Sequence, residues 1–275
     1  MLKRVISGII LVIIALITIL QGGYLLAGVL LFISLVAYRE LMQACKISGE
    51  GKRFFSPLEL MGDAGIIVFY LILVFVGDGM LLLMEVSMVL IGMMTIYVFT
   101  FPAYRAEQVM SALFNVVYAP LMLSCIYMTR NLSYGIYIVW MIFISSWICD
   151  TCAYFVGVCI GKHKLAPKLS PHKSIEGAVG GIVGSAVVGG LYGYFVVEQV
   201  VSEQNITWIF AIISAAGAVI SQIGDLAASA IKRNHDIKDY GKLIPGHGGI
   251  MDRFDSVIFT APVIYLLAFL MIKQI

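Results

Sequence analysis

Residues 5–42 read VISGIILVIIALITILQGGYLLAGVLLFISLVAYRELM, two long apolar runs that follow each other almost directly. Each run is close to the length of about 20 residues that a helix needs to cross about 30 Å of hydrocarbon. The rest of the 275-residue chain is similar: 61% of its residues are hydrophobic, 12% are charged, and its mean hydropathy is +0.98. This composition excludes an ordinary soluble globule and predicts an all-α polytopic integral membrane protein.

The apolar runs predict about nine transmembrane helices. We expect them over residues 5–20, 22–42, 62–77, 80–100, 109–129, 134–160, 177–197, 206–231 and 254–273. The first run, preceded by Lys3 and Arg4, has the features of a signal peptide. No small-x-small cleavage site follows it, so we expect it to be retained.

Positive charges predict the orientation, because Lys and Arg are held on the cytoplasmic side of a membrane. With nine spans and a cytoplasmic N-terminus, all but two of the chain's 18 Lys and Arg residues lie on inner segments. The two on outer segments are Arg130 and Lys273. The C-terminus is therefore expected outside, and the most basic loops face the cytoplasm.

The chain divides into two predicted regions without a soluble domain. Residues 1–130 hold about five N-terminal spans, and residues 131–275 form a C-terminal catalytic region with inner loops at 161–176 and 232–253. Both loops are basic and contain glycine and proline. Retention of positive charge inside explains the lysines alone, but not the run His247-Gly248-Gly249 or the acids among the bases.

Two aspartates lie within apolar spans near their predicted inner ends. A lone carboxylate at mid-membrane costs about 3 kcal/mol on insertion scales, so such residues usually face a bundle interior or a wet cavity. Asp225 shares a helix face with Ser221, Ser229 and Lys232, and Asp150 shares one with Tyr154, Gly157 and Gly161. A salt bridge toward Lys232 is the alternative for Asp225, and a hydrogen-bonded or protonated structural acid is the alternative for Asp150.

Small residues recur every four positions in the seventh span, at Gly181, Ser185, Gly189 and Gly193. This pattern lets helix backbones approach closely, either within one subunit or across a possible homodimer. Cys149 and Cys152 form a CxxC inside an apolar helix. They are expected to be small packing residues rather than a zinc or redox pair.

The inner loops combine groups that suit phosphate chemistry. Glycine-rich backbone and Lys or Arg bind phosphate oxygens, whereas carboxylates in the same place require a cation between them and the phosphates. Mg²⁺ prefers oxygen ligands and is typically held by one or two carboxylates with substrate phosphates. The loops therefore predict metal-assisted phosphoryl or nucleotidyl transfer.

Residues 229–255, SAIKRNHDIKDYGKLIPGHGGIMDRFD, closely resemble the signature of the phosphatidate cytidylyltransferases, or CDP-diacylglycerol synthases. We call them the signature segment. Residues 150–181, DTCAYFVGVCIGKHKLAPKLSPHKSIEGAVGG, resemble the second recurrent stretch of that family. The resemblance implies transfer of the cytidylyl group of CTP to phosphatidic acid, with Mg²⁺, giving CDP-diacylglycerol and pyrophosphate in phospholipid biosynthesis.

The resemblance and the chemistry together give a set of candidate site residues. Asp225 and Asp252 are expected to hold the divalent metal, one ion or two, with Asp150 or Asp255 as helpers. Lys232, Arg233 and Arg253 are expected to contact phosphates, and His247 to present backbone donors or to act on the leaving group. The candidates for substrate binding are Ser170, Lys173, Ser174, Glu176, Ser229, Lys238, Lys242, Gly248 and Gly249. His163, His172 and His235 are expected to be loop histidines.

Two alternatives remain at this stage. Another enzyme that uses CTP on a lipid, such as a polyprenyl cytidylyltransferase or a CTP-dependent lipid kinase, would carry similar loops. A secondary transporter would place acids near mid-span in two related halves, which the sequence does not show. We expect the lipid bilayer and the two substrates as partners, no nucleic acid, and a bacterial plasma membrane location.

Overall fold

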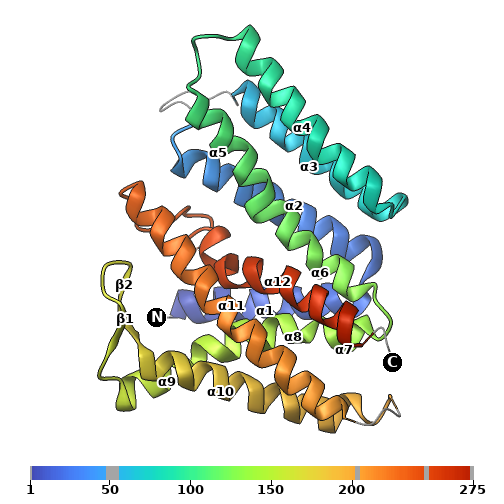
Figure 1. The fold of residues 1–275 in the computed structure, drawn as a ribbon, viewed down its shortest axis with the longest axis vertical. Helices are drawn as coiled ribbons and strands as arrows, with labels where there is room; N and C mark the ends of the chain where they lie inside the picture. The colour runs from blue at the N-terminus through green and yellow to red at the C-terminus, as the bar shows by residue number, and fades with distance from the viewer. Residues whose placement is uncertain (1, 48–55, 202–204, 245–247, 273–275) are drawn as a thin grey trace. The chain divides into compact units, whose positions relative to one another are not determined.

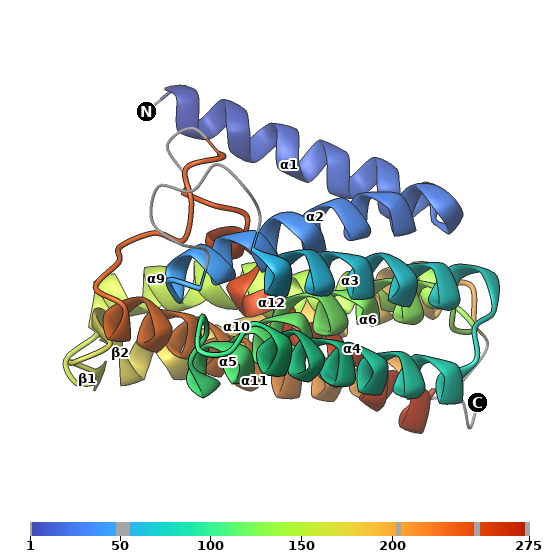
Figure 2. The same ribbon diagram turned by 90° about the horizontal axis from the view of Figure 1, so that it is seen from above.

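A computed structural model of the chain describes residues 2–47, 56–201, 205–244 and 248–272 (Figures 1 and 2). The N-terminal elements are α1 (Leu2–Gln21), α2 (Gly23–Ala44), α3 (Pro57–Phe75), α4 (Gly79–Phe99), α5 (Ala106–Val116), the π-helical turn η1 (Val117–Leu121) and α6 (Met122–Arg130). The helices α5, η1 and α6 form one continuous apolar segment, Ala106–Arg130, and the wide turn η1 contains Pro120. Because proline has no N–H to donate, it interrupts the regular α-helical hydrogen bonding at that point.

The C-terminal elements include a small hairpin among the helices. They are α7 (Gly135–Ile138), α8 (Trp140–Phe143), the π-helical turn η2 (Ile144–Ile148), α9 (Cys149–Ile160), β1 (Lys164–Ala166), β2 (Ser170–Ser174), α10 (Ile175–Tyr192), the π-helical turn η3 (Gly193–Val197), α11 (Ile206–Asn234) and α12 (Met251–Met271). The strands pair antiparallel, with Lys164 opposite Ser174 and Ala166 opposite Ser170. This hairpin lies where the sequence predicted only an irregular inner loop.

Within the described residues, eight helical segments are long and apolar enough to cross a membrane, and they correspond to the second to ninth predicted spans. The first predicted span corresponds to α1, in which Ile10–Gln21 is the apolar stretch counted as a shorter helix. The chain is thus an α-helical integral membrane protein. The count of nine spans and the sidedness of the termini stay predictions.

Capping residues explain where two of the early helices begin. The α3 helix begins at Pro57, five residues before its predicted start, because the Ser56 hydroxyl accepts a hydrogen bond from Glu59 N at 3.1 Å. Proline suits the first helical position, since its missing N–H would have had no partner there. Asp78 caps α4 in the same way, accepting from the backbone N–H of Met80 at 2.8 Å.

The helices group into two compact units, which we describe separately. The first unit comprises Met1–Ser124 with His235–Arg253, and the second comprises Cys125–Asn234 with Phe254–Ile275. The first three residues of α12 therefore group with the first unit and the remainder with the second.

In the first unit, α2 packs against α3 through a row of polar contacts. Ser34 and Tyr70 hydroxyls are hydrogen-bonded at 2.9 Å, and Arg39 forms an ion pair with Asp63 at 2.9 Å. The buried Tyr38 ring lies directly against Gly62. A side chain at position 62 would overlap this ring, so glycine is required for the two helices to approach.

In the second unit, α10 packs against both α9 and α11, and Figure 1 shows these three helices side by side with the hairpin at one end. A Cβ added to Gly181 would lie 2.8 Å from the Cys149 carbonyl oxygen, and one added to Gly189 would lie 2.5 Å from the Ser214 side chain. Ser185 and Ser214 hydroxyls are hydrogen-bonded at 2.8 Å. The stripe of small residues therefore packs within one chain, which is one of the two arrangements that the sequence allowed.

The two cysteines of the CxxC also pack against this helix. Cys149 Sγ lies against Gly181, and Cys152 Sγ lies against Gly184. Cys149 is buried, and its sulfur accepts a hydrogen bond from Gln222 Nε2 at 3.3 Å. Their role as small packing residues in the α9–α10 interface is confirmed.

Candidate active site

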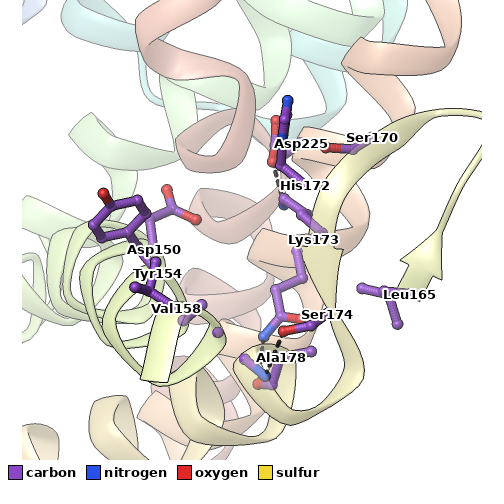
Figure 3. Close-up of a pocket in the computed structure, with 14 residues that line it drawn as sticks. Asp150, Tyr154, Val158, Leu165, Ser170, His172, Lys173, Ser174, Ala178 and Asp225 are labelled. Carbon is purple, nitrogen blue, oxygen red and sulfur yellow. Dashed lines mark hydrogen bonds and ion pairs between the residues drawn. The ribbon is translucent and has the colours of Figure 1, made fainter. Parts of the chain in front are cut away.

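A cavity of about 490 Å³ lies in the second unit, beside the hairpin (Figure 3). Its wall combines residues of three helices and both strands of the hairpin. The lining residues are Asp150, Ala153, Tyr154, Gly157 and Val158 of α9, Leu165 of β1, Ser170, His172, Lys173 and Ser174 of β2, Gly177 and Ala178 of α10, and Gln222 and Asp225 of α11. The cavity therefore brings residues of the 150–181 stretch together with Gln222 and Asp225 of α11, which lie just before the signature segment.

Two carboxylates and one lysine dominate the charge of this cavity. Lys173 Nζ forms an ion pair with Asp225 Oδ2, and each side chain is about a quarter exposed, at 26% and 27%. Asp150 lies on α9 in the same wall, exposed to the cavity. The partner that the structure gives Asp225 is thus Lys173 from the hairpin, whereas the sequence alternative paired it with Lys232.

A third carboxylate belongs to the same electrostatic neighbourhood. Asp255 of α12 is half-buried and accepts a hydrogen bond from Ser256 N at 2.8 Å. The charges of Asp225, Asp150 and Lys232 all act on its carboxyl group. Three predicted metal ligands of the second unit are therefore close enough to influence one another, and a basic residue from the end of α11 partly compensates them.

Gln222 lines the cavity, although the sequence analysis did not identify it as a candidate site residue. Its side-chain amide donates to the Ala178 carbonyl at 2.9 Å and to Cys149 Sγ, so it links α11 to α10 and α9 one turn before Asp225. Ser221, which the sequence placed on the polar face of Asp225, is fully buried instead. The polar face at the cavity thus begins at Gln222 and Asp225.

Ser174 has a structural role as well as a place in the cavity wall. Its hydroxyl accepts a hydrogen bond from Gly177 N at 3.1 Å and so caps the N-terminus of α10. The same hydroxyl lies against Gly157 and Gly161, where a Cβ would come within 3.0 Å and 2.6 Å of it. The three glycines let the end of α9, the hairpin and the start of α10 meet at one side chain.

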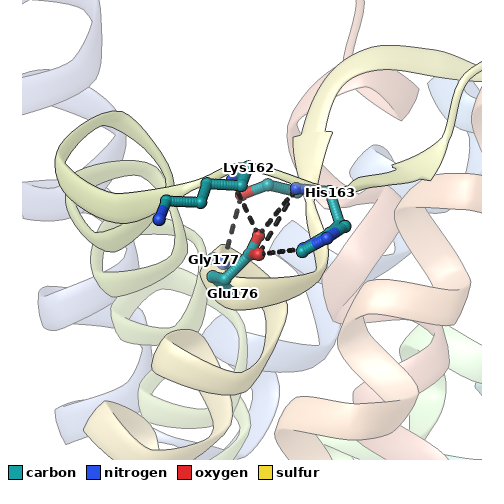
Figure 4. Close-up of polar contacts among 5 residues, drawn as sticks. Lys162, His163, Glu176 and Gly177 are labelled. Carbon is teal, nitrogen blue, oxygen red and sulfur yellow. Dashed lines mark hydrogen bonds and ion pairs between the residues drawn. The ribbon is translucent and has the colours of Figure 1, made fainter.

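Glu176 anchors the base of the hairpin rather than the cavity (Figure 4). Its carboxylate accepts hydrogen bonds from Lys162 N at 3.0 Å and His163 N at 3.2 Å, and it contacts His163 Nδ1 at 2.6 Å. Glu176 is not among the residues that line the cavity. Its carboxylate thus holds the backbone just before β1, and its place beside the nucleotide stays a prediction.

Three further candidates lie near the C-terminal end of α11, and one histidine that was expected in a loop lies in β2. Ser229 and Lys232 are half-buried and Arg233 is exposed, all in the last two turns of α11. His172, expected to be a simple loop histidine, lies in β2 and lines the cavity. Its position could be found only once the 161–176 stretch was known to form a hairpin.

The remaining candidates lie in the first unit. Asp252 is buried, and its Oδ2 accepts hydrogen bonds from Tyr240 N at 2.8 Å and Gly249 N at 2.9 Å. The Gly249 donor, predicted to face phosphates, is therefore used within the protein, while Gly248 has a φ of +82° that favours glycine. Lys238, Lys242 and Arg253 are exposed, and His247 lies outside the described residues.

Sequence reasoning also missed Glu40, a buried residue of α2 in the first unit. Its carboxylate accepts hydrogen bonds from Ile250 N at 3.0 Å and Met251 N at 2.8 Å, at the start of α12. No local pattern around residue 40 distinguishes it from a membrane-edge glutamate.

The aspartates of the cavity are residues of the second unit that could hold a metal ion. Among the described residues, no group of three or more His, Cys, Asp or Glu side chains is arranged closely enough to enclose a metal ion. Asp150 and Asp225 nevertheless offer carboxylate oxygens to one cavity, which fits an ion that takes one or two carboxylates and completes its shell with phosphate oxygens and water.

These features define a polytopic α-helical membrane protein with a cavity lined by two aspartates, a lysine and a histidine. A sequence model described as the cytidylyltransferase family matches residues 2–271. The chain belongs to this family.

Curated relatives agree with the family match. The phosphatidate cytidylyltransferase of Bacillus subtilis (strain 168) is 43% identical over 140 residues, 50% of each chain, and that of Haemophilus influenzae is 42% identical over 134 residues, 46% of that relative's length. The match thus spans about half the length of these two relatives. The phosphatidate cytidylyltransferase of Staphylococcus saprophyticus is 32% identical over 272 residues, 96% of this chain and 97% of that one.

Proposed function

We propose that the cavity of the second unit belongs to the active site of a phosphatidate cytidylyltransferase. The chain transfers the cytidylyl group of CTP to phosphatidic acid, giving CDP-diacylglycerol and pyrophosphate in phospholipid biosynthesis. The observation that carries this proposal is the pairing of Asp225 with Lys173 beside Asp150 in one cavity of an integral membrane protein. The family match over residues 2–271 and the names of the relatives support it.

The reaction requires no protein nucleophile. An oxygen of the phosphatidic acid phosphate, already ionised at neutral pH, attacks the α-phosphorus of CTP. A new P–O bond forms there while the bond from the α-phosphorus to the bridging oxygen breaks, and pyrophosphate leaves with that electron pair. The chain therefore contributes by holding two anionic substrates together and by stabilising the charge on the leaving group.

Basic residues of the second unit supply this stabilisation. Lys173 is placed in the cavity wall with its ammonium group on Asp225, so it can exchange that carboxylate for a phosphate oxygen. Lys232 and Arg233 at the end of α11 provide further positive charge, and cations at a helix C-terminus are favoured by the helix dipole. We expect Lys173 and Lys232 to contribute most, because both are partly buried.

Mg²⁺ is the cation that we propose for this site, with Asp225 and Asp150 as carboxylate ligands. When bound, it would neutralise phosphate charge and polarise the α-phosphate. The Asp225 carboxylate lies in the cavity wall, and a metal ion could take the place of the Lys173 ammonium group that now pairs with it. The assignments of Asp252 and Asp255 as further ligands stay predictions from the sequence.

We also propose that the site faces the cytoplasm of a bacterial plasma membrane. The distribution of Lys and Arg over the apolar spans supports this orientation, and the relatives named above are bacterial. A cytoplasmic site gives access to CTP, while a position at the membrane gives access to the lipid phosphate.

A product assay tests the proposed activity. Purified protein in detergent is incubated with CTP labelled in the cytosine ring, Mg²⁺ and phosphatidic acid, and the lipid and soluble products are separated. We expect the label in the lipid and one pyrophosphate released per lipid formed. Release of CDP instead would indicate phosphate transfer by a lipid kinase, and the absence of any labelled lipid would contradict the proposal.

A further inference from the structure

Glu40 is a buried acid whose partners lie 210 and 211 residues further along the chain. It lies near the C-terminal end of α2 with only 6% of its surface exposed, and both its carboxylate oxygens accept backbone hydrogen bonds. The donors are Ile250 N and Met251 N, at the start of α12. The first N–H groups of a helix have no partner within the helix, so an external acceptor is needed there.

Two glycines of the signature segment make room for this carboxylate. An added Cβ at Gly241 or Gly249 would overlap the Glu40 carboxylate oxygens. A side chain at either position would therefore push the Glu40 carboxylate away from its present place. Gly241 and Gly249 therefore act as spacers that let the segment close around Glu40.

Glu40 and Asp252 together hold the same stretch of backbone. Asp252 accepts from Tyr240 N and Gly249 N, and Glu40 accepts from the next two residues, Ile250 and Met251. The two carboxylates are close enough for their charges to act on each other. Because like charges repel, the backbone N–H donors are what hold the two carboxylates in place. A shift of one carboxylate therefore changes the electrostatic environment of the other.

We propose that Glu40 is a positioning residue of the cytidylyltransferase reaction, which fixes the start of α12 and thereby the orientation of Asp252 and Arg253. The inference rests on the proposed function and on the prediction from the sequence that Asp252 and Arg253 take part in that reaction. It assigns a role in the reaction to the N-terminal helices. It also implies that the donors at the start of α12 are engaged by a protein carboxylate instead of a substrate phosphate.

The test compares Glu40→Gln with Glu85→Gln. Glutamine keeps the shape of the side chain but replaces one carboxylate oxygen with an NH₂ group, which donates and cannot accept. One of the two backbone N–H groups at the start of α12 therefore loses its acceptor. Glu85 is a matched control, since it is also a buried acid of the first unit, 7% exposed, and faces Gly65 of α3. Turnover, KM for CTP and the Mg²⁺ concentration for half-maximal activity are measured for both variants and the parent.

We expect Glu40→Gln to lower turnover about 10-fold to 100-fold, as for catalytic groups displaced by about 1 Å, and to raise the Mg²⁺ requirement. Glu85→Gln should keep parental kinetics, and turnover is compared per folded protein, with folding followed by melting in detergent. Parental turnover and Mg²⁺ requirement in folded Glu40→Gln would overturn the proposal. So would a loss of activity that only follows the fraction of folded protein.

A second variant covers the case in which Glu40→Gln does not fold. Gly241→Ala displaces the carboxylate without removing it and should reduce turnover in the same way. Parental turnover in folded Gly241→Ala would by itself overturn the proposal. When both single variants fold, the two substitutions combined should cost clearly less than the product of their separate effects. Independent, multiplicative effects would contradict the proposed link.

Hydrogen exchange separates this inference from the activity itself. Amide exchange in residues 248–252 should be at least tenfold faster in Glu40→Gln than in the parent, and unchanged in Glu85→Gln. If the parent forms no CDP-diacylglycerol, the proposed function fails, while the exchange result still reports whether Glu40 holds the segment. Equal exchange in parent and variant would refute the positioning role.

Discussion

The tight packing of α10 against α9 predicts that Gly181→Ala destabilises the protein although alanine favours helices. The substitution gains about 1 kcal/mol in intrinsic helix propensity. Against this gain, the new methyl group would lie 2.8 Å from the Cys149 carbonyl oxygen, 2.9 Å from its sulfur and 3.0 Å from the Ala153 Cβ. A backbone carbonyl cannot turn away as a side chain can, so the full overpacking penalty of about 1–3 kcal/mol applies.

Subtracting the gain of about 1 kcal/mol from the penalty of about 1–3 kcal/mol leaves an expected net loss of up to about 2 kcal/mol. Val183→Leu is the control, because it adds a carbon atom to the same helix on a side chain that is 55% exposed. Melting followed in detergent at one heating rate should give a lower midpoint for Gly181→Ala and the parental midpoint for Val183→Leu. A Gly181→Ala protein as stable as the parent would show that α9 and α10 are not in this close contact.

Three further predictions concern the cavity and the hairpin. Asp225→Asn should reduce CDP-diacylglycerol formation at least about 100-fold at saturating Mg²⁺, because it removes an acid that we assign to the metal; normal formation by folded protein would exclude that role. Lys173→Met should raise the KM of a phosphate-bearing substrate, since it removes the cation nearest Asp225, and unchanged KM values would argue against phosphate contact. Glu176→Ala should release the turn at Lys162 and His163, so trypsin should cleave after Lys162, Lys164 or Lys168 faster than in the parent; equal cleavage rates would contradict its anchoring role.

Most of the helical architecture could be predicted because membrane-crossing length is a strong local signal. Observed and predicted spans differ mainly at their ends, where single residues decide. The α3 helix begins early because Ser56 caps it and Pro57 suits the first position, neither of which changes the hydropathy of the run. The hairpin was missed because its strands, of three and five residues, are too short to give a periodic pattern.

The candidate site could be predicted in part, because acids within apolar spans are costly and therefore informative. Asp150 and Asp225 were identified in this way and line one cavity, together with Ser170, Lys173 and Ser174. Glu176 was identified by resemblance, yet it binds the hairpin base. Gln222 and Glu40 were missed because each acts through a contact with residues distant in the sequence, and nothing local records such a contact.

The hold of Glu40 on the start of α12 limits how this protein can be dissected. A fragment that kept only the C-terminal half would carry the signature segment and the 150–181 stretch but would lose the acceptor for Ile250 and Met251. Those amides would then be left without a partner in apolar surroundings, at a cost of about 1–3 kcal/mol each. We therefore expect the smallest folded unit that keeps the start of α12 in place to include α2 as well as the signature segment.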